Sequence, residues 1–264
     1  MLDNKDTETL KSIKVKLMNE LSIHSKLTVL QGPFRGQKLS RNAYWGGTDI
    51  TAKILGNYER EVQSTIQNLS TKGFRYLVDI GAGDGFYAVG ALHSKLFDKV
   101  LAYERADKAR ENIYSNMKLN SVNSNNYKVF PASNTEVISK NIKEENIDPT
   151  KLVILVDIEG DEYRLIDKYF LEQFSSSFII IEIHRRRILD IYDIAPPPRN
   201  LCLEEELKKF GQSVKDRKVD KLYRTSYEIP STLEWLADLS DDERLLLLSE
   251  SRDSMPEWWV IHPK

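Results

Sequence analysis

The feature that most constrains the fold is a glycine-rich turn between two apolar segments. Residues 76–91 read YLVDIGAGDGFYAVGA, in which an apolar run leads to Gly81, Gly83 and Gly85, and a second apolar run follows. This order predicts a buried strand, a tight turn and a helix. Glycines are expected where a backbone approaches a ligand closely or takes a positive φ. Asp79 ends the strand, so its carboxylate should face the adjoining crevice.

A second strand, predicted at Val100–Glu104, ends in another carboxylate. Glu104 follows the glycine turn by about 20 residues, the spacing at which nucleotide-binding folds place an acid that holds the ribose hydroxyls. The dinucleotide fingerprint G-x-G-x-x-G would need a glycine at position 86, where the chain has Phe86. After a third strand near Tyr127–Pro131, Ser133 and Asn134 are candidates for contact with a base, with capping of the following helix as the alternative.

The second anchor is an acidic segment after a fully apolar strand. Leu152–Val156 predicts a central parallel strand, and Asp157, Glu159, Asp161 and Glu162 follow within six residues. Such a cluster needs a cation, a proton or helix N-terminal amides to offset its repulsion. For Asp157 and Glu159 we favour a catalytic role, whereas Asp161 and Glu162 are interpreted as opening a helix over residues 163–174.

A further strand, Phe178–His184, carries two more candidate residues. Strand alternation places Glu182 and His184 on the same face. The histidine is a candidate base or metal ligand, with a structural role as the alternative. Three arginines at 185–187 follow directly and could form a solvated rim or meet an anionic substrate.

Strands and helices alternate along most of the chain, which predicts an α/β fold with a doubly wound parallel sheet covered on both faces. We expect an N-terminal helical or lid extension over residues 1–70 and a ligand-binding domain over 71–264. The extension begins with an amphipathic helix in residues 6–30. The glycine- and aromatic-rich segment Gly32–Ile50 should form either a lid or a plug at the domain edge. Near the C-terminus we expect a helix at 201–210 stopped by Gly211, a helical insertion at 230–249 and a last strand at 257–262.

Composition excludes several classes of protein. The 264 residues carry 38 basic and 40 acidic side chains, a net charge of −2 that gives no overall attraction to nucleic acid. No apolar run reaches the length of a membrane span, and the charged N-terminus does not resemble a signal peptide, so we expect a cytoplasmic location. The single cysteine, Cys202, excludes an internal disulfide.

Three motifs together resemble those of a known family. D-I-G-A-G-D-G at 79–85 resembles motif I of class I S-adenosylmethionine (SAM) methyltransferases, and V-D-I-E-G-D-E at 156–162 with I-E-I-H at 181–184 is similar to FkbM-type methyltransferases of that class. G-P-F-R-G-Q-K-L and the L-G-N-Y-E-R-E run also resemble the N-terminal extension of bacterial relatives. The likeness extends from Gly32 to His262. It implies a Rossmann-like, mostly parallel seven-stranded sheet of order 3-2-1-4-5-7-6, SAM as methyl donor, and O-methylation of a sugar or polyketide hydroxyl.

The resemblance also implies roles for individual residues. Asp79, Gly81, Gly83 and Gly85 would form the methionine-side loop, and Glu104 would hold the ribose. Asp157 would lie between the methionine moiety and the substrate. A similarity to macrolide sugar O-methyltransferases, which bind magnesium, implies Asp157, Glu182 and His184 as ligands, although a glutamate and a histidine replace the paired aspartates of those enzymes.

The expected function is therefore SAM-dependent methylation of a hydroxyl on a small molecule such as a glycan or glycolipid precursor, with His184, Asp157 or Glu159 as proton acceptor. Homo-oligomerisation stays open. The alternatives are an NAD(P)-dependent oxidoreductase, which Phe86 disfavours, and a non-catalytic Rossmann-like binding protein. Nucleic-acid methylation would predict a basic face, which the chain lacks.

Overall fold

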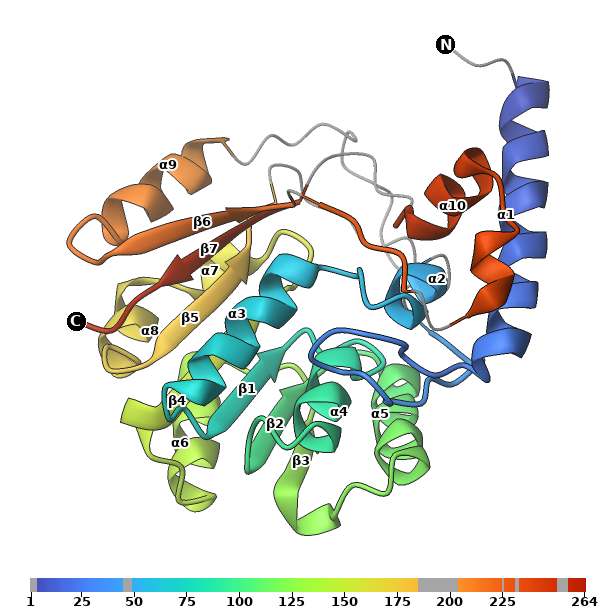
Figure 1. The fold of residues 1–264 in the computed structure, drawn as a ribbon. Coiled ribbons are helices and arrows are strands. Elements are labelled where there is room, and N and C mark those ends of the chain that lie inside the picture. Colours follow the sequence, from blue (N-terminus) through green and yellow to red (C-terminus); the bar gives the residue numbers. More distant parts are fainter. Residues whose placement is uncertain (1–3, 45–48, 185–203, 225, 231–232, 251–255) are drawn as a thin grey trace.

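A computed structural model of the chain describes residues 4–44, 49–184, 204–224, 226–230, 233–250 and 256–264. Figure 1 shows a central twisted sheet with helices on both faces and a long N-terminal helix at one side. The arginines at 185–187, the residues at 45–48 and Cys202 lie outside the described residues.

The sheet has seven strands in the order β3-β2-β1-β4-β5-β7-β6, which confirms the expected α/β Rossmann-like topology. The first five strands in the chain pair in parallel, and β7 is antiparallel to both β5 and β6. The strands are β1 (Tyr76–Ile80), β2 (Lys99–Tyr103), β3 (Tyr127–Phe130), β4 (Leu152–Val156), β5 (Phe178–Glu182), β6 (Val219–Tyr223) and β7 (Glu257–Ile261).

Strand alternation divides the core between the two faces of the sheet. Leu77, Val153 and Ile180 face one cluster with the N-terminal helices, whereas Val78 and Ile154 face a second cluster. Helices on the first face are α1 (Asn4–Ser25), α2 (Ile50–Ile54), α3 (Arg60–Thr71), α4 (Phe86–His93), α5 (Asp107–Leu119) and α10 (Asp241–Leu248), and those on the second are α6 (Thr135–Glu144), α7 (Glu162–Leu165), α8 (Lys168–Gln173) and α9 (Glu204–Ser213). All five residues of β4 are buried, as a central parallel strand requires.

The N-terminal segment shares a core with the sheet. Leu17, Leu21 and Phe34 are buried in the same cluster as Leu77 of β1. A side chain at Gly90 of α4 would place its Cβ 2.5 Å from the Phe34 ring, so this glycine makes room for the phenylalanine. Phe34 therefore acts as a plug at the edge of the domain, one of the two roles expected for residues 32–50.

Two helix boundaries differ from the expectation. The helix expected at 163–174 is two short helices, because the Asp167 side chain accepts a hydrogen bond from the backbone N–H of Phe170 and starts α8 anew. The helix expected to stop at Gly211 instead continues to Ser213. A Cβ at Gly211 would lie 3.7 Å from the Trp259 ring, so this position is packed against β7 within the helix.

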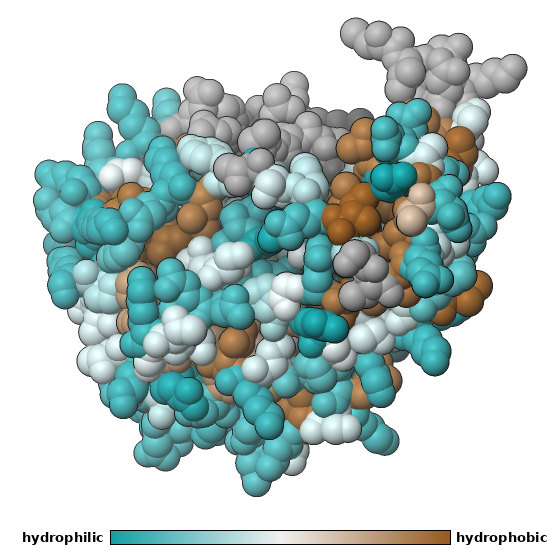
Figure 2. Space-filling view, in the orientation of Figure 1, coloured by the Kyte–Doolittle hydropathy of each residue, from teal (hydrophilic) through white to brown (hydrophobic). Residues whose placement is uncertain are grey.

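No helix in the described ranges is both long and apolar enough to cross a bilayer. On the face in Figure 2, apolar side chains reach the surface beside α1 and α10. Leu10, Ile13 and Leu245 are partly exposed there and line a groove of about 780 Å³.

Candidate functional site

The glycine turn lies at the carboxyl edge of the sheet, between the ends of β1, β2 and β4. The backbone N–H groups of Gly81 and Ala82 both donate to the carbonyl of Tyr103, the last residue of β2. Gly81 has a φ of 86°, and a Cβ there would lie 1.7 Å from the carbonyl oxygen of Asp157. Only glycine can occupy this position, because the turn is packed against the chain that leaves β4.

Asp79 is the most perturbed carboxyl group of the turn. Its side chain is 3% exposed, and within the described part of the chain its Oδ2 atom has no hydrogen-bond partner. Burial and then the charge of Asp157 raise the pKa of Asp79 to about 8, against a hydrogen bond from the backbone of Ala88. A buried carboxyl oxygen without a donor is costly, so this position favours a ligand that brings a cation or a donor.

Glu104 bridges the turn and the segment after β2. Its carboxylate accepts hydrogen bonds from the backbone N–H groups of Gly83 (2.9 Å) and Ala106 (2.8 Å). This contact brings the end of β2 against the glycine turn. A carboxylate has further lone pairs to offer a ligand's hydroxyl groups.

Ser133 and Asn134 follow β3 at the same edge of the sheet. The Asn134 side chain accepts a hydrogen bond from the Val137 N–H at 3.1 Å and so caps α6, as one of the two alternatives for this residue predicts. The Ser133 hydroxyl donates to the Pro131 carbonyl at 2.9 Å. The Asn134 amide N–H groups are separate from this cap, so a role in base contact stays a prediction.

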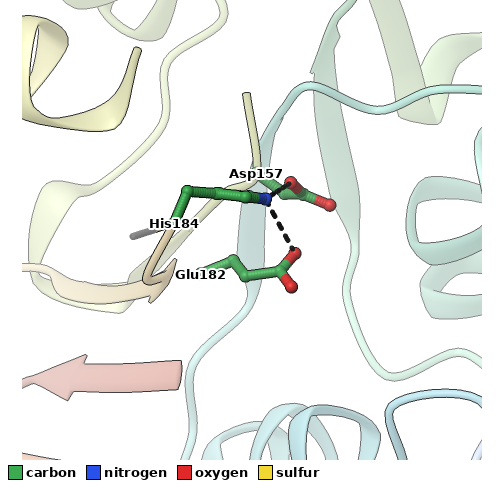
Figure 3. Close-up of side chains that lie close together, drawn as sticks. All are labelled: Asp157, Glu182 and His184. Atoms are coloured by element: carbon green, nitrogen blue, oxygen red, sulfur yellow. Dashed lines mark ion pairs between the residues drawn. The ribbon is translucent and has the colours of Figure 1, made fainter. Parts of the chain in front are cut away.

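His184 lies among four carboxylates contributed by two strand ends and the start of α7. Its Nε2 atom is 3.9 Å from Asp157 Oδ1, 3.4 Å from Glu159 Oε2 and 3.9 Å from Glu182 Oε2. The fourth is Glu162, and we refer to these five residues as the His184 cluster. Figure 3 shows Asp157, Glu182 and His184 converging from the ends of β4 and β5.

Three members of the cluster lie close enough together that they could hold a metal ion. Asp157, Glu182 and His184 each offer a ligand atom, and these atoms lie within 4.8 Å of one another. Two carboxylates and one imidazole suit several divalent cations. The residues named as metal ligands from the sequence are therefore brought together, and their donor set fits a divalent ion.

Glu162 is the residue of this site that sequence reasoning missed. The sequence pattern predicts that Glu162 opens a helix. In the structure its side chain is fully buried, and its Oε1 lies 2.9 Å from His184 Nδ1. The same oxygen accepts from the backbone N–H groups of Ile158 and Gly160. Glu162 thus fixes the imidazole with Nε2 toward Asp157 and Glu182, as outer carboxylates orient ligand or catalytic histidines. The signal available in the sequence was its place in an acidic run that precedes a histidine-ending strand.

The carboxylates determine the protonation of His184 in the absence of a cation. Burial disfavours the charged imidazolium, but hydrogen bonds with Glu159 and Glu162 and the charge of Asp157 outweigh it and raise the pKa of His184 to about 12. For Glu162, burial raises the pKa, but the hydrogen bond with His184 and its charge outweigh this and lower it overall. A divalent cation bound beside Nε2 would therefore require His184 to lose its proton.

Asp84 connects the glycine turn to the N-terminal extension. Its Oδ2 accepts from the backbone N–H of Tyr44 at 2.8 Å, and its Oδ1 accepts from Asn112 Nδ2 at 2.8 Å. Asn112 also donates to the carbonyl of Asn42. Residues 42–44 are thus tied to the turn.

Comparison with known proteins finds no matching family model and no match among curated proteins. Solved structures with a similar arrangement include a precorrin-6y C5,15-methyltransferase from Geobacter metallireducens, with 14% identity, a TM-score of 0.41, and coverage of 78% of this chain and 89% of that one. The methyltransferase domain of a bacterial CtHen1 has 11% identity and a TM-score of 0.43, covering 76% and 97%. A precorrin-8w decarboxylase from Methanobacterium thermoautotrophicum has 14% identity and a TM-score of 0.43, covering 77% and 90%. TM-scores and sequence identities as low as these do not indicate which activity this protein has.

Proposed function

We propose that the protein is a SAM-dependent methyltransferase of the FkbM type that methylates a hydroxyl group of a small molecule. The observation that carries the proposal is Asp79, a buried carboxyl group at a turn of three positive-φ glycines, with one oxygen that has no hydrogen-bond partner among the described residues. A carboxyl group here can ionise beside a cation, so this position favours the ammonium and sulfonium groups of SAM over the pyrophosphate of a dinucleotide. Phe86 in place of the third fingerprint glycine points the same way.

The chain's own residues would bind and orient the two reactants. Glu104 would accept hydrogen bonds from the ribose hydroxyls, and the glycine turn would let the methionine end approach the backbone. Ser133 and Asn134 would lie beside the base. When bound, SAM supplies an electrophilic methyl group on a sulfonium, so catalysis depends mainly on alignment and on removal of the acceptor's proton.

The His184 cluster would form the acceptor side of the site. Asp157, Glu182 and His184 would hold a divalent cation such as Mg²⁺, which would lower the pKa of an acceptor hydroxyl. Glu159, with its side chain 45% exposed and 3.4 Å from His184, is then placed to accept the proton. The acceptor would be a hydroxylated small molecule, for which a glycan or glycolipid precursor is our expectation.

Titration calorimetry with S-adenosylhomocysteine (SAH) and NAD⁺ tests the class of cofactor. We expect wild type to bind SAH and not NAD⁺, and Asp79→Ala and Glu104→Gln each to weaken SAH binding roughly tenfold, since each removes a charge-assisted hydrogen bond. His184→Ala should keep the SAH affinity, because His184 lies on the acceptor side. Binding of NAD⁺ alone would support the oxidoreductase alternative, and binding of neither would support a non-catalytic protein.

A further inference from the structure

The run at residues 55–61, LGNYERE, connects segments that are far apart in the chain. The Asn57 side chain donates to the carbonyl of Glu228 and accepts from its N–H at 2.8 Å. Arg60 pairs with the Glu228 side chain at 2.7 Å, and Glu61 lies 3.5 Å from Arg224. The start of α3 is therefore held by the segment that follows β6.

Glu59, at the centre of this run, has an unusual backbone. Its φ of 42° lies in the left-handed region, which is costly for a residue with a Cβ and persists only where the surroundings impose it. The backbone N–H of Glu59 donates to Glu250 Oε1 at 3.1 Å, and Glu250 pairs with Arg224 at 2.7 Å. Residues 191 positions apart in the sequence thus hold Glu59 in place.

The strained backbone presents the Glu59 side chain to the interior beside the glycine turn. The side chain is fully buried, and its Oε2 accepts a hydrogen bond from the Tyr87 hydroxyl at 2.6 Å. Tyr87 is the second residue of α4, immediately after Gly85 and Phe86. The negative charge of Glu59 also contributes to raising the pKa of Asp79, so the two carboxyl groups influence each other electrostatically.

We propose that Glu59 is a cofactor-positioning residue: its buried carboxylate, oriented by Tyr87, acts together with the Asp79 carboxyl group and selects a ligand that carries the α-ammonium group of the methionine moiety. The inference rests on the proposed function. Glu59 acts across a protein interior, where the attraction between charges is less screened than in water. Two buried carboxyl groups that influence each other ionise more readily when a cation binds, so an ammonium group gains from both.

Calorimetry with SAH and 5′-methylthioadenosine tests the proposal. The two ligands share the adenosine and thioether groups, but only SAH has the amino-acid end with its ammonium. We expect Glu59→Gln to weaken SAH binding roughly tenfold and to leave 5′-methylthioadenosine binding within twofold of wild type. A purely structural role for Glu59 would weaken both ligands equally, and that result, or no change for either, overturns the proposal.

Three variants separate charge from structure. Glu144→Gln removes an exposed carboxylate that pairs with Lys140 on α6, and its ratio of SAH to 5′-methylthioadenosine affinity should match wild type. Glu59→Gly removes the carboxylate while accepting the positive φ without strain, so it should reproduce the selective loss if Glu59→Gln folds poorly. Tyr87→Phe keeps the charge but frees its orientation, so we expect a smaller selective loss. If wild type binds neither ligand, the proposed function itself fails, which is a different outcome from equal weakening by Glu59→Gln.

Discussion

At the scale of single residues, the site is defined by carboxyl groups in unlike surroundings. Asp79 is buried with one oxygen unpartnered in the described structure, whereas Glu104 accepts two backbone hydrogen bonds and Glu162 accepts bonds from two backbone groups and faces His184. These carboxyl groups thus have different roles, because burial and hydrogen bonding decide whether the protonated or the ionised form of each is more stable.

The raised pKa of Asp79 predicts a pH dependence of folding stability. An aspartate with a pKa of 3.8 when unfolded and about 8 when folded binds more protons in the folded state between these values, so stability falls as the pH rises through this window. Asp79→Asn should remove this contribution, at most about 1.4 kcal/mol per pH unit. Urea unfolding of wild type and variant at pH 5 and pH 7.5 measures the difference.

Asp216→Asn, a change at an exposed carboxylate, is the matched control and should leave the pH dependence of wild type unaltered. If Asp79→Asn and wild type lose stability equally between the two pH values, Asp79 is not protonated in the folded protein at the lower one.

At the scale of elements, the site depends on the close contact between the carboxyl ends of β1 and β4. The register pairs Ile80 with Val156, and the Asp157 N–H then donates to the Ile80 carbonyl at 2.9 Å. Gly81, the residue that follows β1, packs against the Asp157 carbonyl. The contact places Asp157 beside the glycine turn and so joins the cofactor and acceptor sides of the site.

Gly81→Ala should therefore be strongly destabilising. The added Cβ would overlap the Asp157 carbonyl in addition to straining a φ of 86°, and we expect a loss of at least about 3 kcal/mol in the free energy of unfolding. Gly73→Ala is the control, because its φ is 94° but the described structure places no atom within 4 Å of the added Cβ. It should cost only about 1 kcal/mol. Equal losses in denaturant titrations of the two variants would show that the overlap is relieved by a small shift.

At the scale of the whole molecule, the N-terminal segment and the sheet form one core. Phe34 is fully buried, and its ring lies 5.4 Å from that of Phe86 and 5.9 Å from that of Tyr87 between ring centroids. The segment assigned from the sequence to a separate extension thus packs directly on the helix that follows the glycine turn.

Phe34→Ala should lower the free energy of unfolding of the whole protein by about 3–5 kcal/mol, with a single transition by both circular dichroism and tryptophan fluorescence. The substitution would leave a cavity in the hydrophobic cluster that also contains Leu77 of β1, so it should weaken the sheet as well as the N-terminal segment. Ile23→Ala, on α1 with the isoleucine 66% exposed, should change stability by less than about 0.5 kcal/mol. Two separate transitions in wild type would contradict a shared core.

Local patterns in the sequence were sufficient for the order of elements, because the apolar run of residues 152–156 and the glycines at 81–85 each carry their signal within a few neighbours. The strand order was implied by the family resemblance, and the sheet confirms it. Carboxyl groups at strand ends could also be foreseen, since parallel strands present their ends at one edge.

The tertiary structure alone decided which of these groups meet. Glu162 looked like an ordinary helix-opening acid, and Glu59 like one charge in a charged helix, yet both are fully buried. Their partners, His184 and Tyr87, lie 22 and 28 positions away, and Glu250 is 191 positions from Glu59. Burial and pairing at such separations depend on the packing of the folded chain, so the glycine turn at 81–85 was evident from the sequence, whereas the burial and partners of Glu59 and Glu162 were not.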